Sequence, residues 1–134
     1  MDDLEAIRKK RLQELRHSLE ARQYPAEPMT VTDDSFNSFI SQYPLVVIDC
    51  WAQWCGPCRI LSPIIDQLAS ELQGKIVFGK LDTDQNPKIS QNMGISSIPT
   101  LLFFQKGHLV DHVSGALPKQ LLLEKLRPLI NGQR

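Results

Sequence analysis

Hydrophobic positions after residue 28 alternate between strand-like and helix-like patterns. Residues 45–48 form a continuous, largely β-branched run, which is typical of a strand buried on both faces. Isoleucine and leucine then recur at helical spacing from Ile60 to Leu72, which predicts a helix that ends near Gly74. Pro63 lies inside this pattern and predicts a kink.

The remaining pattern alternates in the same way. We expect further strands around Val31 and at residues 75–82, 100–105 and 109–114, and further helices at residues 36–40, 86–93 and 118–130. Lys106-Gly107 signals a hairpin between the last two strands. This order predicts an α/β fold with a central mixed sheet and helices on both faces.

Helix ends are marked by capping residues and prolines. Thr32 or Asp33 is the expected cap of the helix at residues 36–40, and Asp84 or Asn86 that of the helix at residues 86–93. Pro128 is expected to kink the last helix or to end it early.

The first 28 residues differ from the rest because charged residues alternate with isolated apolar ones. The apolar residues recur at spacings of three to five and predict a helix over residues 2–22, about 31 Å long: Leu4, Ile7, Leu12, Leu15 and Leu19. So narrow a stripe is rarely stable without a surface to lie on. Pro25 and Pro28 then form a short linker. The chain therefore divides into a charged helical extension with its linker, residues 1–28, and a compact domain, residues 29–134.

Composition excludes several classes of protein. The 134 residues carry 15 Lys and Arg against 15 Asp and Glu, so no net charge attracts nucleic acid or an anionic membrane, and both are unlikely partners. The basic run Arg8–Arg11 is expected to be a solvated helix face. The apolar runs are too short to span a bilayer or to form a secretory signal. With three cysteines, a disulfide-stapled secreted scaffold is also unlikely, and we expect a cytoplasmic protein.

Cys55 and Cys58 form a C-x-x-C pair where the buried strand passes into the helix. Such a pair is a specific redox signal, because two cysteines one turn apart can close a small disulfide ring. Cys55 would lie at the helix N-terminus, where free N–H groups and the dipole favour a thiolate. We therefore expect Cys55 to be the nucleophile and Cys58 the resolving thiol of thiol–disulfide exchange.

Asp49 ends the apolar strand, where burial of a carboxylate is costly. It is either a partly exposed acid at a strand end or a buried acid with a raised pKa that takes the proton of Cys58. The residue chemistry alone leaves both readings open.

The domain resembles the thioredoxin family over nearly all of residues 29–134. The run Trp54-Cys55-Gly56-Pro57-Cys58 matches the family's active-site motif. Further matches occur at characteristic positions: Asp49, Trp51, Ala52, Pro63, Lys80, Asp82, Ile98, Pro99, Thr100, Gly107 and Gly115.

The resemblance implies a thioredoxin fold and a role for each matched position. Asp49 is then the buried proton acceptor, with Lys80 as its charged neighbour. Pro99 is a cis-proline that faces the disulfide, and the backbone of Ile98 pairs with the substrate chain. The dipeptide Gly56-Pro57 is typical of the reducing members.

The resemblance also implies a substrate surface and the redox partners. We expect Trp54, Ile98, Gly115 and Ala116 to line a docking patch for disulfide-containing proteins. A thioredoxin reductase would supply the electrons, and no cofactor is implied.

Two other functions compete with a protein-disulfide reductase. A metal site would use Cys50, Cys55 and Cys58, but a fourth cysteine is missing, and Cys50 is expected to be a buried, inert residue of the strand. A non-catalytic interaction module would work through the N-terminal helix, which is also a candidate surface for a partner or for self-association. The intact set of Cys55, Cys58, Asp49 and Pro99 favours the reductase.

Overall fold

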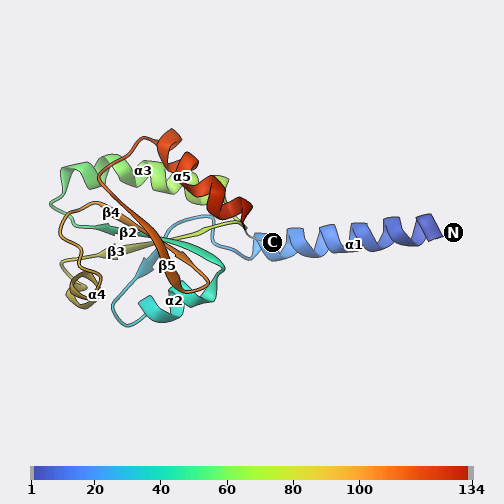
Figure 1. Cartoon of the computed structure of the whole chain (residues 1–134), viewed down its shortest axis with the longest axis horizontal. Helices are drawn as coiled ribbons and strands as arrows, with labels where there is room; N and C mark the ends of the chain where they lie inside the picture. Colours follow the sequence, from blue (N-terminus) through green and yellow to red (C-terminus); the bar gives the residue numbers. More distant parts are fainter. Residues whose placement is uncertain (1, 133–134) are drawn as a thin grey trace.

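The computed structural model describes residues 2–132 and shows a central sheet covered by helices on both faces (Figure 1). The elements in chain order are α1 (Asp2–Arg22), β1 (Met29–Val31), α2 (Phe36–Gln42), β2 (Leu45–Trp51), α3 (Gly56–Glu71), β3 (Val77–Asp82), α4 (Pro87–Asn92), β4 (Thr100–Gln105), β5 (His108–Ser114) and α5 (Lys119–Asn131). Residues 1 and 133–134, the outer ends of the two predicted parts, lie outside the described residues.

The sheet is mixed and has the order β1-β3-β2-β4-β5. β1, β3 and β2 are parallel, whereas β4 is antiparallel to both β2 and β5. The predicted alternation of strands and helices and the hairpin at Lys106-Gly107 are therefore confirmed. None of the described helices is long and apolar enough to cross a membrane.

The central strand β2 is buried on both faces, as its continuous apolar run predicts. Leu45 and Val47 face the core under α3 and α5, and Val46 and Ile48 face the core under α2 and α4. Because successive side chains of a strand alternate, Asp49 falls on the α3 side and Cys50 on the α2 side. The strand's register thus brings one carboxylate beneath the start of α3.

The cap predicted for α2 is wrong, and α5 does not end early. α2 begins after Ser35, and the Asp33 carboxylate instead accepts hydrogen bonds from the Lys88 and Ile89 backbone N–H groups in the first turn of α4. α5 continues past Pro128 to Asn131. Pro128 therefore does not end the helix early.

β3 begins at Val77, two residues later than expected, because the chain is still turning after α3. The Lys75 and Ile76 N–H groups both donate to the Leu72 carbonyl. α4, by contrast, has Asn86 as its N-cap, one of the two predicted caps.

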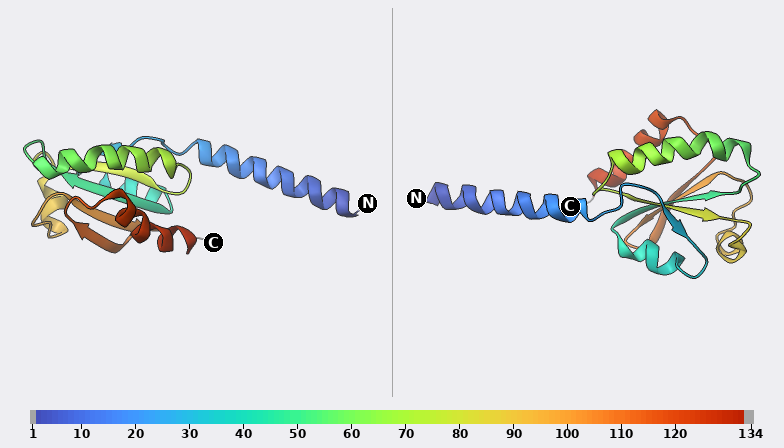
Figure 2. Two further views of the ribbon diagram at one scale, coloured as in Figure 1. Left: turned by 90° about the horizontal axis from the view of Figure 1, so that it is seen from above. Right: turned by 180° about the vertical axis from the view of Figure 1, so that it is seen from behind.

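The N-terminal helix α1 has the predicted bounds but projects away from the domain (Figures 1 and 2). Its apolar stripe is 49–63% exposed from Leu4 to Leu19. The expectation that this stripe lies on a surface is therefore not met within the described part of the chain. A partner or a second copy that covers it stays a prediction.

The linker after α1 contacts the domain. The Tyr24 ring packs edge-to-face on Tyr43, with centroids 5.2 Å apart, and the Tyr24 carbonyl accepts a 2.7 Å hydrogen bond from the Gln73 side-chain amide. The chain is thus anchored two residues after α1 ends.

Truncation tests this anchor. A chain without residues 1–22 should keep the domain's stability and the disulfide reduction that the resemblance implies, because the described side chains of α1 are exposed. A chain without residues 1–28 should lose about 1–2 kcal/mol of unfolding free energy together with the Tyr24 contacts. Urea unfolding and insulin reduction measure both quantities. Loss of activity on removal of residues 1–22 alone would show that α1 contributes to the site.

Candidate active site

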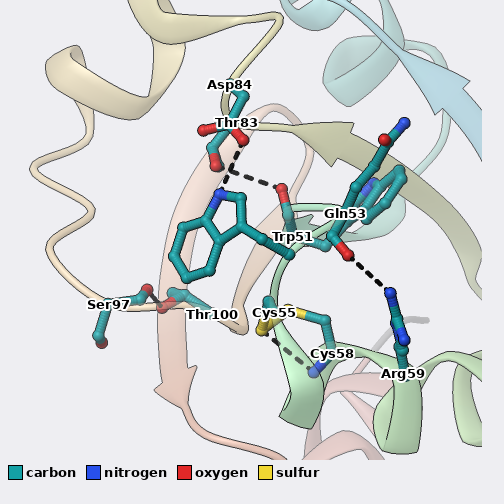
Figure 3. The surroundings of a disulfide bond; sticks show 10 residues. Trp51, Gln53, Cys55, Cys58, Arg59, Thr83, Asp84, Ser97 and Thr100 are labelled. Atoms are coloured by element: carbon teal, nitrogen blue, oxygen red, sulfur yellow. Dashed lines mark hydrogen bonds between the residues drawn. A yellow bond between two sulfur atoms is a disulfide. The ribbon is translucent and has the colours of Figure 1, made fainter.

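The two cysteines of the C-x-x-C pair lie at the N-terminus of α3 and are joined as a disulfide (Figure 3). Cys55 is the N-cap, Pro57 lies in the first turn, and the Cα atoms of Cys55 and Cys58 are 5.3 Å apart. The Cys58 backbone N–H donates to Cys55 Sγ at 3.2 Å. A helix N-terminus with an N–H group aimed at the sulfur favours the thiolate of Cys55 once the disulfide is reduced.

Exposure does not distinguish the two sulfurs. Cys55 is 3% exposed and Cys58 5%. Their positions do differ, because Cys55 precedes the helix and accepts from its first turn, whereas Cys58 belongs to that turn. Helix position, not exposure, is therefore the feature that favours Cys55 as the attacking sulfur.

A loop from distant sequence packs against the pair. The Ile98–Pro99 peptide bond is cis, as the resemblance implied, and Ile98 packs on the cluster that holds both cysteines. The Thr100 hydroxyl donates to the Ser97 carbonyl, and the Gly115 N–H donates to the Pro99 carbonyl at 2.8 Å. Gly115 has a φ of +97°, a backbone conformation that favours glycine.

Trp54 lies beside the disulfide with 70% of its surface exposed. Its indole N–H donates to the Asp84 carboxylate at 2.8 Å. Trp54 and Ile98 line one groove of about 340 Å³ together with the hydroxyls of Thr83, Ser90, Ser96 and Ser97. Ala116 is not among the lining residues and packs against the core under α5. Gly115 is not a lining residue either, so of the four residues predicted for the docking patch only Trp54 and Ile98 share this groove.

Asp49 is only 2% exposed, so it is a buried acid and not a partly exposed one at the strand end. Burial raises its pKa to about 6, against the opposing effect of the Lys80 ammonium, and the nearby Asp66 carboxylate adds to the rise. Its Oδ1 atom has no hydrogen-bond partner among the described residues. Asp49 and Cys58 line the same pocket of about 390 Å³.

Lys80 lies directly across the β2–β3 register from Asp49. The ammonium, however, donates to the Ser62 hydroxyl at 2.6 Å and lies 3.6 Å from Asp66 Oδ1. Sequence reasoning missed both partners. A signal was present, because Ser62 and Asp66 follow Cys58 at intervals of four residues and so share its face of α3.

Cys50 is fully buried on the opposite face of the sheet from Asp49, as strand alternation predicted. Burial raises the pKa of its thiol to about 12, and the Asp49 charge adds to the rise. Within residues 2–132, no three His, Cys, Asp or Glu side chains gather in a way that could hold a metal ion.

Comparison with protein families decides what this site belongs to. The thioredoxin family model matches residues 27–128. The chain belongs to the thioredoxin family. It is 47% identical over 114 residues to the chloroplastic M-type thioredoxin of Pisum sativum, a match that covers 84% of this chain and 66% of the pea protein. It is 46% identical over 98 residues to thioredoxin 1 of a Nostoc species, covering 72% of this chain and 91% of that protein.

The fold agrees with this assignment. A mutant thioredoxin from Halobacterium salinarum superposes with a TM-score of 0.74 at 29% identity, over 78% of this chain and 92% of that one. This thioredoxin-family chain is a thiol–disulfide oxidoreductase, a protein-disulfide reductase whose partner types are disulfide-containing proteins and a thioredoxin reductase. The interaction-module alternative gains no support from these relatives.

The buried carboxylate makes a prediction about stability. The Asp49 pKa is about 6 in the folded chain against about 3.8 when exposed, so folding favours its protonated form. The contribution of the protonated Asp49 to the unfolding free energy is fully present below about pH 4. It is lost as the pH rises through 6. Asp49→Asn should therefore raise the unfolding free energy by about 3 kcal/mol at pH 8 relative to the wild type, and the gain should fade below pH 4.

Urea unfolding of the oxidised protein at several pH values measures this gain. Asp34→Asn, at an exposed carboxylate in the turn before α2, is the matched control and should show no such pH dependence. A destabilised Asp49→Asn protein at pH 8 would contradict the direction of the pKa shift.

Proposed function

We propose that Cys55 and Cys58 reduce disulfides in protein substrates through a mixed disulfide on Cys55. The Cys55 thiolate attacks one sulfur of the substrate disulfide, and the other substrate sulfur leaves as a thiolate. Cys58 then attacks Cys55 Sγ, which releases the second substrate thiol and leaves the Cys55–Cys58 disulfide. Two electrons pass to the substrate. The observation that carries this assignment is the position of Cys55 at the N-terminus of α3, with the Cys58 N–H aimed at its sulfur.

Asp49 is the proposed acceptor of the Cys58 proton during the second attack. Its raised pKa and its place in the same pocket as Cys58 support this role. A carboxylate that titrates near pH 6 is poised to take a proton and to give it up again near neutral pH. Lys80 assists by its positive charge, which favours the ionised form of Asp49.

The proposed substrate surface is the groove beside the disulfide. Trp54 and Ile98 offer apolar contact, and the exposed backbone of Ile98 can pair with an extended substrate segment. Gly115 supports the cis-Pro99 turn through its N–H, and Gly56 and Pro57 form the exposed start of α3.

A thioredoxin reductase, linked to NADPH or to ferredoxin, would reduce the Cys55–Cys58 disulfide again after each cycle. The sequence favours a reducing compartment, and the cytoplasm is our proposed location. The relatives named chloroplastic, from Pisum sativum and Spinacia oleracea, keep a reducing organelle as the other candidate.

Trapping tests the roles of the two cysteines. Cys55→Ser should abolish insulin reduction, because the attacking sulfur is lost. Cys58→Ser should retain the first attack and accumulate mixed disulfides on Cys55, seen as slower bands on gels without reductant. In the same single-turnover assay, Asp49→Asn should slow the second step at least about tenfold while the first is little changed. Equal slowing of both steps would refute a proton-acceptor role for Asp49, and mixed disulfides on Cys58 would reverse the cysteine assignment.

The reduction potential tests the direction of electron flow. Equilibration of the Cys55–Cys58 couple against a dithiol buffer should give about −270 mV, the established value for the reducing members of the family. A value above about −200 mV would indicate an oxidant or an isomerase instead.

A further inference from the structure

A row of polar side chains follows one face of α3 behind the active-site disulfide. Cys58, Ser62, Asp66 and Ser70 are spaced four residues apart, so they lie one above the other on successive turns. Cys58 and Ser62 line the pocket that holds Asp49, and Asp66 and Ser70 line a second pocket under the linker. Lys80 lines both pockets and is therefore the side chain at which they meet.

The Lys80 ammonium is held between an inner and an outer partner. The Ser62 hydroxyl, on the Asp49 side, accepts its hydrogen bond at 2.6 Å. The Asp66 carboxylate, on the linker side, lies 3.6 Å away, and its side chain is 59% exposed. Asp49 has no contact of this kind with Lys80, and its Oδ1 atom is unpartnered among the described residues. The distance of the ammonium from Asp49 is thus set by its other two partners.

We propose that Ser62 and Asp66 are positioning residues that act on Asp49 in opposite directions through the place of the Lys80 ammonium. Ser62 keeps the ammonium on the Asp49 side and so favours the ionised acid. Asp66 draws the ammonium toward solvent and also repels a charge on Asp49, so it favours the protonated acid. The two residues together set the pH at which the second step of disulfide reduction operates. This inference rests on the proposed role of Asp49 as proton acceptor.

Other ionisable groups face this part of the molecule. From α3 these are the Cys58 thiol, once reduced, and Arg59, whose guanidinium donates to the Gln53 carbonyl at 3.3 Å. From the linker there is Glu27, which lines the second pocket with Lys80 and Asp66. The Cys50 thiol lies on the other face of the sheet. Among the described residues, only Ser62 and Asp66 have side chains in contact with the Lys80 ammonium.

If Ser62 and Asp66 place the ammonium in this way, their removal should shift the pH at which Asp49 titrates in opposite directions. Asp66→Asn removes the outer partner and a like charge, so Asp49 should titrate at lower pH. Ser62→Ala releases the ammonium toward Asp66, so Asp49 should titrate at higher pH. At pH 5.5 the second step should become about twofold faster in Asp66→Asn and about two- to threefold slower in Ser62→Ala.

The experiment is a carboxyl ¹³C NMR titration of Asp49 in the full-length oxidised protein, with the signal assigned by its loss in Asp49→Asn. Ser62→Thr keeps a hydroxyl at this position and should restore the wild-type midpoint. Ser70→Ala, on the same face of α3 but without a contact to the ammonium, should leave it unchanged. In a Lys80→Met background, Ser62→Ala should no longer move the midpoint, because no ammonium remains to be placed.

Midpoints that move in opposite directions in Asp66→Asn and Ser62→Ala support the proposal. Midpoints that stay fixed, move the same way, or still respond to Ser62→Ala without Lys80 overturn it. The titration does not depend on activity, so it separates this proposal from the role of Asp49. If the midpoints move as expected but the single-turnover rates do not follow, the positioning stands and the proton-acceptor role fails.

Discussion

Burial of a single carboxylate beneath the start of α3 is the constraint around which this site is built. Asp49 is on the α3 side of the central strand because strand alternation places it on the same face as Leu45 and Val47. The energetic cost of that burial falls on the folded state at neutral pH, when the acid is ionised. The same cost produces a group that exchanges protons near neutral pH, next to a thiol that must lose one. The folded state is thus less stable at the position where the proposed mechanism places its base.

The site is assembled from segments that are far apart in the sequence. Cys55 and Cys58 come from the start of α3, Ile98 and Pro99 from the loop before β4, and Gly115 from the end of β5. Because β4 is antiparallel to β2 and β5, the start of β4 lies beside the ends of β2 and β5, at one end of the strands. Each segment is short and held by backbone hydrogen bonds, which leaves the Trp54 indole as the large exposed group beside the disulfide.

Sequence reasoning predicted the fold and the reacting pair because their signals are local. The continuous apolar run of β2, the helical spacing in α3 and the C-x-x-C pair each lie within a short window. It could not decide whether Asp49 is buried, because burial depends on what packs over the strand end. It also missed Asp84 as the partner of Trp54 and Ser62 as the partner of Lys80, since both contacts join different elements. The Asp33 prediction failed in the same way, because its hydrogen-bond partners lie more than 50 residues away.

Asp33, which does not cap α2, joins two segments that lie far apart in the sequence. The Asp33 carboxylate accepts hydrogen bonds from the first turn of α4, and the Asp33 backbone N–H donates to the Asn86 side chain. Asn86 follows Asp84 by two residues, and Asp84 holds the Trp54 indole. The turn between β1 and α2 therefore acts as a brace for one wall of the substrate groove. We therefore expect substitutions in that turn, far from any sulfur, to change the rigidity of the groove wall without altering the dithiol itself.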